Sequence, residues 1–181
     1  AAQSVSATCF LAPIQIVELG DGQLMVYQPA EGSACLNEKN KPARLDRLKL
    51  SRVLRDLAEG LQSLHASGQT WGRMHPSQLY ETEQGYQLGR WGSWSTEGLE
   101  EDPFYVADLA AHPDTAGSGD IASLGRMAML LGFGTVTAAK VTAKSRLDKL
   151  ILRMAAPSEE QQRPSAEQVT LSLIHISEPT R

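Results

Sequence analysis

The side chains with the clearest chemical character lie in an irregular loop and at the end of the hairpin that follows it. Arg73, His75 and Gln78 fall in the loop QTWGRMHPSQLY, and Arg90 stands in GRWG. A guanidinium group stays protonated and only donates hydrogen bonds. Arg73 and Arg90 can therefore bind an anion, but neither can accept a proton as a general base.

A long amphipathic helix must position this loop, because it comes immediately before it. Its apolar residues recur at i, i+3, i+4, i+7, i+11 and i+14, which is one continuous helical stripe. The stripe consists of Leu50, Val53, Leu54, Leu57, Leu61 and Leu64. Gly68 stands where a left-handed residue commonly ends a helix. After the loop at 69–80, Tyr86 and Leu88 predict a short hairpin strand that ends at Gly92.

The segments before the helix predict a hairpin. Residues 14–19 alternate at nearly period two, Gly20-Asp21-Gly22 is a turn signal, and 23–27 predicts the partner strand. No helix follows the GxG of this turn, so we interpret it as a hairpin turn and not as a phosphate-binding loop. Residues 29–40 are predicted to form a loop with one short helix around Cys35.

The second half of the chain predicts helices. We expect a short helix at 104–112, a turn at 116–119 and a helix at 120–131. The 120–131 segment is apolar on all sides, which is typical of a central buried helix. Further helices are predicted at 147–154 and from Ser165 to about 170.

Composition limits the class of protein. A chain of 181 residues with 41% hydrophobic and 21% charged residues suits one globular domain. The net charge of −4 gives no reason to expect nucleic acid or an anionic membrane as a partner. The longest apolar run, 127–131, is far too short to span a membrane, and no signal peptide is visible. Only Cys9 and Cys35 are present, which favours a reducing compartment, and we expect a cytoplasmic location.

The last eleven residues need separate treatment. Residues 171–181, LSLIHISEPTR, resemble translated sequencing-adapter DNA along their whole length. We interpret them as an artefact and exclude them from the functional argument.

Four segments, in this order, resemble the eukaryotic-type (Ser/Thr-like) protein kinase superfamily. They are LMVYQPAEG, LQSLHASG, DIASLGRMAMLL and LDKLILRMAAPSEEQQRPSAEQV, and the resemblance covers roughly residues 12–170. It implies an α+β, protein-kinase-like fold with a mostly helical C-lobe and a remnant N-lobe β-hairpin. The implied domains are 1–28 for the remnant of the small lobe and 29–170 for the C-lobe, followed by the adapter-like 171–181.

The resemblance assigns the loop residues one by one. Trp71-Gly72-Arg73 stands where the family has His-Arg-Asp, His75 where it has Lys, and Gln78 where it has the metal-binding Asn. Pro76 matches the family. Phosphoryl transfer requires a carboxylate that accepts the proton of the substrate hydroxyl, and Arg73 cannot do this.

The second replaced acid is the metal ligand. Arg90-Trp91-Gly92 stands where the family has Asp-Phe-Gly. A positive charge about 4 Å from a divalent cation costs about 8 kcal/mol at an effective dielectric near 20. One neutral oxygen from Gln78 would not offset this cost. The resemblance thus implies a degenerate pseudokinase without catalytic residues or a metal.

Three further implications follow from the resemblance. Asp120 would hold the backbone of the catalytic loop. Arg163 would lack its usual Glu partner, because Ala107-Asp108-Leu109 stands where the family has Ala-Pro-Glu. The residues implied for a nucleotide pocket are Met25, Val26, Tyr27, Gln28, Leu79 and Gly89.

The residues themselves support no other catalytic centre. His65, His75 and His112 lack metal-ligand spacing with either cysteine, and no Ser-His-Asp arrangement has supporting context. Trp71, Trp91 and Trp94 are interpreted as packing residues. The alternative without a functional role is that Arg73 and Arg90 are ordinary surface arginines of a different fold.

We therefore expect a catalytically inactive, kinase-like regulatory or protein-interaction module. Its partner would be another protein or a fused domain, with no cofactor and no metal. One alternative is an atypical active kinase that uses a displaced acid such as Glu81 or Asp102. A second is a sensor that binds ATP or another anion without metal, and a third is a plain helical interaction domain.

Overall fold

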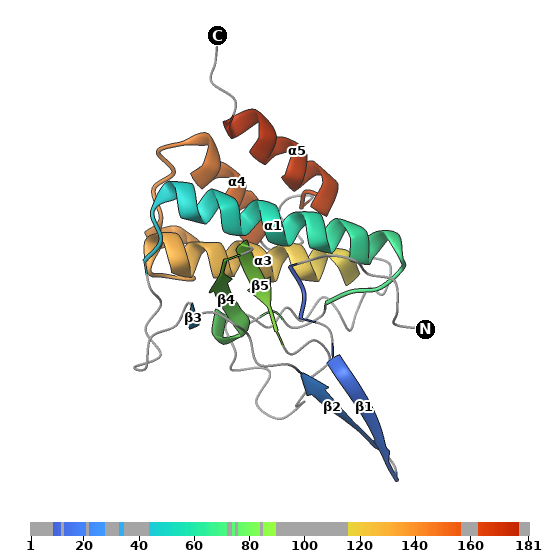
Figure 1. The fold of residues 1–181 in the computed structure, drawn as a ribbon. Helices are drawn as coiled ribbons and strands as arrows, with labels where there is room; N and C mark the ends of the chain where they lie inside the picture. Colours follow the sequence, from blue (N-terminus) through green and yellow to red (C-terminus); the bar gives the residue numbers. More distant parts are fainter. Residues whose placement is uncertain are drawn as a thin grey trace.

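Figure 1 shows a layer of helices with two small antiparallel sheets beneath it in a computed structural model. The longest helix, α1 (Arg47–Ala66), packs against both α3 (Ala116–Phe133) and α5 (Ala166–Ser177). The structure describes residues 9–11, 13–20, 22–27, 33–34, 44–71, 74, 76–83, 85–89, 116–156 and 163–177. The predicted helices around Cys35 and at 104–112 lie outside these residues.

Helix α1 confirms the apolar stripe expected from the sequence. All six stripe residues are buried, because the stripe faces the other helices. Asp46 caps the start of α1 by accepting a hydrogen bond from the Lys49 amide. At the other end, Gly68 has a φ of 73°, and its amide donates to the His65 carbonyl. This left-handed glycine ends the helix and directs the chain into the loop.

Helix α3 is the buried central helix that the sequence predicted, but it begins earlier than expected. It starts at Ala116, so the predicted turn at 116–119 is its first turn. The glycines of this segment led to the prediction of a turn, but in the structure Gly117 allows close packing of α3. A Cβ on Gly117 would lie 3.0 Å from Nδ1 of His65, so the glycine allows α3 to approach the end of α1. The region of α3 is apolar and long enough to cross a membrane by composition alone, yet its side chains form the core between α1 and α4.

Helix α4 (Arg146–Ala155) crosses α3 at close range. A Cβ on Gly125 of α3 would lie only 2.6 Å from the Ala155 amide nitrogen, so a side chain there would strike backbone. The start of α4 carries a capping box between Ser145 and Asp148, in which each side chain accepts a hydrogen bond from the other residue's amide.

Helix α5 extends further than the sequence analysis expected. A second reciprocal cap, between Ser165 and Gln168, opens it. The helix then continues to Ser177, through most of the adapter-like segment, and buries Leu173. Leu171 and Ile174, from the same segment, are large apolar side chains that remain at least 42% exposed.

The strands form two separate sheets. β1 (Pro13–Leu19) and β2 (Gly22–Tyr27) form the predicted antiparallel hairpin, which projects away from the helices in Figure 1. The second sheet has the order β3-β4-β5, with β3 (Ser33–Ala34), β4 (Leu79–Thr82) and β5 (Gly85–Leu88).

Two parts of the second sheet differ from expectation. β3 lies within the predicted loop 29–40, and β4 begins at Leu79, inside the predicted loop 69–80. Residues 9–11 also run alongside β5, where the Leu11 amide donates to the Leu88 carbonyl. These pairings join segments far apart in sequence, which local patterns do not reveal. The architecture remains α+β and mostly helical, as predicted.

Candidate functional site

The best-defined polar arrangement of the site joins the end of α1, the start of the loop and Asp120, which follows the first turn of α3. Asp120 is fully buried, and its Oδ2 lies 2.9 Å from Nε2 of His65. The same oxygen accepts a hydrogen bond of 2.8 Å from the backbone amide of Trp71. The expectation that Asp120 holds the loop backbone is therefore confirmed.

His65 is a part of this arrangement that the sequence analysis did not assign. The sequence analysis considered it only as a metal ligand and found no suitable spacing to either cysteine. In the structure its ring contacts the buried carboxylate of Asp120 and packs against Gly117. The His65 side chain therefore connects the end of α1 to the start of α3. The helical spacing could place His65 near the end of α1, but only the fold brings it to Asp120, 55 residues away.

Apolar packing fixes the loop on its other side. The Trp71 side chain is buried, and its ring lies 4.6 Å from that of Phe10, centroid to centroid. Trp71 is thus a packing residue, as expected. Met74 and Pro76 are also buried, so the described part of the loop rests on the core.

Three of the predicted site residues come together where β4 begins and β5 ends. Gln78 ends a 3-10 turn, Leu79 opens β4, and Gly89 follows β5. The Gly89 amide donates to the Gln78 carbonyl over 2.9 Å. A Cβ on Gly89 would lie 3.2 Å from Cδ1 of Leu11, so the glycine permits this close approach. All three predicted residues are buried.

The other predicted site residues are placed less fully. Met25, Val26 and Tyr27 lie in β2, in a sheet separate from β4 and β5, and Val26 is half-buried. Gln28 lies outside the described residues. The pocket therefore remains a prediction from the resemblance.

The degenerate catalytic positions Arg73, His75 and Arg90 also lie outside the described residues. Of the displaced acids considered, Asp102 lies outside them too. Glu81 is in β4, and its carboxylate pairs with the Lys49 ammonium over 2.9 Å. Within the described part of the chain, no three His, Cys, Asp or Glu side chains gather as metal ligands.

Arg163, which the resemblance implies has lost its usual Glu partner, forms hydrogen bonds to other groups. Its Nε donates to the Ala156 carbonyl, and one guanidinium nitrogen donates to Oγ of Ser118 in α3. These bonds tie the start of α5 to the end of α4 and to α3. The arginine therefore holds helices together in this fold.

Two titrating groups in the described part of the chain have shifted pKa values. Burial raises the pKa of the Cys9 thiol to about 12, so it stays protonated and unreactive. Burial opposes ionisation of Asp148, but hydrogen bonds from Ser145 and the Lys144 amide, together with the charge of Arg47, hold its pKa below the usual value. Neither group belongs to the predicted pocket.

The chain has a Ser/Thr protein-kinase-like fold, and this fold spans nearly the whole sequence. Among solved structures, the chain is similar to the PknI kinase domain of Mycobacterium tuberculosis. One such structure gives a TM-score of 0.69 at 20% identity, covering 96% of this chain and 75% of that chain. A mutant of that domain gives 0.66 at 20% identity with the same coverage.

The other comparisons gave no match: no protein-family model matches the chain, and no curated protein does. The structural likeness therefore establishes the fold. It disfavours the plain helical domain and the view that the loop arginines belong to an unrelated fold.

Proposed function

We propose that this chain is a kinase-like domain that does not transfer phosphate and serves as a regulatory or protein-binding module. The observation that carries the proposal is the pair of replaced acids. The family resemblance implies that Arg73 stands where a proton-accepting Asp is needed and Arg90 where a metal-binding Asp is needed. Each arginine has the opposite charge to the group that it replaces.

The anchoring of the loop supports this proposal. Asp120 still holds the Trp71 amide, and Gln78 still bonds to Gly89 through the backbone. A fold that has kept its loop supports while its reactive positions have changed is better suited to presenting a surface than to catalysis. The pairing of Glu81 with Lys49 also makes this acid a poor substitute base.

The test is phosphate transfer by the full chain. Purified protein is incubated with labelled ATP and magnesium or manganese, and label is followed on the protein itself and on a generic acceptor protein. We expect no label above that of a heat-denatured sample. Magnesium-dependent transfer that disappears in Val26→Trp, which would fill the predicted pocket, would overturn the proposal.

A second candidate function is binding of an anion or a nucleotide without metal. The sequence favours it because Arg73, His75 and Arg90 place up to three cationic donors where the family holds metal. Thermal melting with ATP in EDTA tests it. A stabilisation that is absent in Arg90→Glu supports the sensor, and an unchanged melting temperature in the parent chain rejects it.

A further inference from the structure

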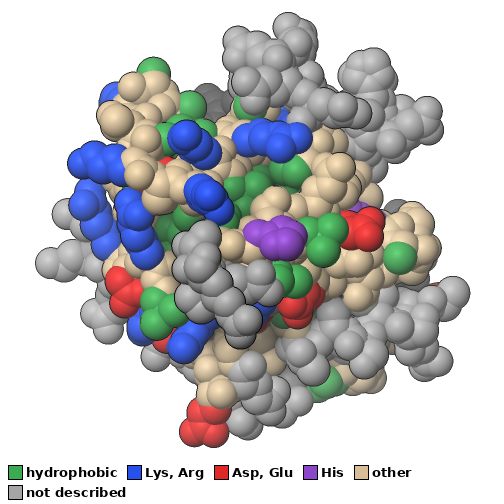
Figure 2. Space-filling model, turned by 90° about the horizontal axis from the view of Figure 1, so that it is seen from above, with side chains coloured by type: hydrophobic (Ala, Val, Ile, Leu, Met, Phe, Trp, Pro, Cys, Tyr) green, Lys and Arg blue, Asp and Glu red, His purple; other side chains and the backbone are tan. Residues whose placement is uncertain are grey.

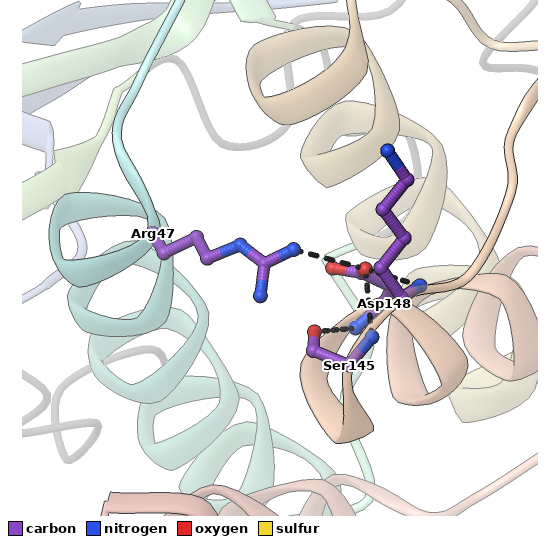
Figure 3. Close-up of polar contacts among 4 residues, drawn as sticks. Arg47, Ser145 and Asp148 are labelled. Atoms are coloured by element: carbon purple, nitrogen blue, oxygen red, sulfur yellow. Dashed lines mark hydrogen bonds and ion pairs between the residues drawn. The ribbon is translucent and has the colours of Figure 1, made fainter.

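A basic surface lies at the end of the molecule where α1 and α4 begin. We define it by six exposed side chains: Arg44, Arg47, Lys140, Lys144, Arg146 and Lys149. The ion pair between Arg47 and Asp148 joins the two helices there over 3.2 Å (Figure 3). Figure 2 shows Lys and Arg side chains gathered on one side of the face that it presents.

The charge of the chain is strongly segregated. Residues 44–55 and 138–153 contain ten of the 17 Lys and Arg residues but only two of the 21 Asp and Glu residues. These two segments therefore carry a formal charge of +8. The rest of the chain, with seven basic and 19 acidic residues, carries −12. The net charge of −4 conceals this division.

The two acids within these segments do little to neutralise the surface. Asp148 points inward, with its side chain 4% exposed, and is occupied by Arg47 and the amides of Lys144 and Ser145. Asp46 caps α1. Among the described residues, no acidic side chain forms an ion pair with the other five members of the basic surface.

Two helix N-termini lie at this surface, and each already has a capping carboxylate, Asp46 in α1 and Asp148 in α4. Helices α1 and α4 both begin at this junction, which the bond from Arg47 to Asp148 marks. Each helix N-terminus carries a partial positive charge of roughly half a unit. Arg146 stands at the first position of α4, where the helix dipole disfavours a cation.

We propose that the basic surface binds a short acidic segment of a partner protein. Such a segment is complementary in charge to the six cations, and the attraction is screened over about 8 Å at physiological ionic strength. A nucleic acid duplex or an anionic membrane is larger and would also respond to the net charge of the whole chain, −4, which repels it. Leu48, which is 65% exposed beside Arg47, offers an apolar contact that suits a peptide side chain. This inference goes beyond the proposed function and holds whether or not the chain transfers phosphate.

The test uses the full chain and a fluorescein-labelled oligo-glutamate peptide, with binding followed by fluorescence anisotropy. The double variant Arg146→Gln/Lys149→Gln removes two surface charges. The control, Gln15→Glu/Gln62→Glu, makes the same change in net charge at two exposed positions in β1 and far along α1. Circular dichroism checks that both variants keep their helices.

We expect salt-sensitive binding that weakens about tenfold in the first variant and less than about twofold in the control. Equal weakening in both variants would show that only net charge matters and would overturn the proposal. The proposal also fails if the parent chain does not bind the peptide. It fails equally if a DNA duplex or phosphatidylserine vesicles bind the same residues more tightly than the peptide does.

Discussion

Each end of α1 contacts a buried carboxylate of another helix, but the regions around the two contacts differ. At its C-terminal end, Asp120 of α3 takes hydrogen bonds from His65 and the Trp71 amide. At its N-terminal end, Asp148 of α4 takes them from Arg47 and two amides. In each case a buried carboxylate near the start of another helix contacts an end of α1.

What each carboxylate holds in place is different. Asp120 holds the backbone at the start of the loop that contains Arg73, where we propose that a catalytic acid has been replaced. Asp148 positions the basic surface, which has no counterpart in the resemblance. The comparison teaches that similar buried carboxylates can support two unlike regions, here a loop that we propose is inactive and a surface that we propose binds a partner.

Substitution of Asp120 should produce the largest loss of stability. Asp120→Ala leaves the buried Trp71 amide without this acceptor and breaks the contact to His65, which should lower the free energy of unfolding by about 3 kcal/mol. Urea denaturation measures this loss. Asp120→Asn, which keeps an oxygen acceptor, should lose less. Equal stability of the parent chain and Asp120→Ala would show that the C-terminal end of α1 is held in another way.

Helix α3, whose Asp120 contacts the C-terminal end of α1, crosses α4, whose Asp148 contacts the N-terminal end of α1. Gly125→Ala would push a methyl group into the backbone of α4, so we expect a loss of about 2 kcal/mol. The matched control is Gly132→Ala, in which the added Cβ meets only the flexible end of the Leu50 side chain. Thermal melting should separate the two variants clearly. A control that is less stable than Gly125→Ala would contradict the close crossing.

The N-terminal end of α1 should depend on pH in a defined direction. The pKa of Asp148 is lowered in the folded state, so its contribution is present above the ordinary value near 3.8 and is lost as pH falls through the lowered pKa. Asp148→Asn should cost about 1 kcal/mol at neutral pH. Urea denaturation at neutral pH and near pH 3 should show this difference shrinking in acid. A difference that stays constant would contradict the assigned role.

The smallest effect is expected at Arg47. Its side chain is 62% exposed, so the ion pair with Asp148 is largely screened by solvent. Arg47→Ala should change the free energy of unfolding by less than about 0.5 kcal/mol, again by urea denaturation. A loss as large as that of Asp148→Asn would show that the ion pair, and not the capping of α4, is the main contribution of Asp148 to stability.

The sequence predicted those parts of the fold that local patterns encode. The stripe from Leu50 to Leu64 placed α1, and the all-round apolar segment placed α3, because helical periodicity is a local property. The resemblance correctly assigned Asp120. The start of α3 was missed because Gly117 and Gly119 imitate a turn, whereas Gly117 allows packing against His65.

The rest depends on contacts between distant residues. β3 and the isolated bridge at Phe10 are too short to be recognised without their partners in β4 and β5. The bond from Arg47 to Asp148 joins residues 101 positions apart, so the basic surface could not be recognised from either segment alone. The pattern Ser145-x-x-Asp148 was a readable capping signal that the sequence analysis passed over.

The central claim is that this kinase-like fold has kept its loop supports and lost its metal-dependent chemistry. Calorimetric titration of the full chain with ATP, in magnesium and in EDTA, tests it most directly. The account predicts that magnesium does not strengthen ATP binding, and that Arg73→Asp/Arg90→Asp gains a dependence on magnesium. ATP binding by the parent chain that requires magnesium would contradict it.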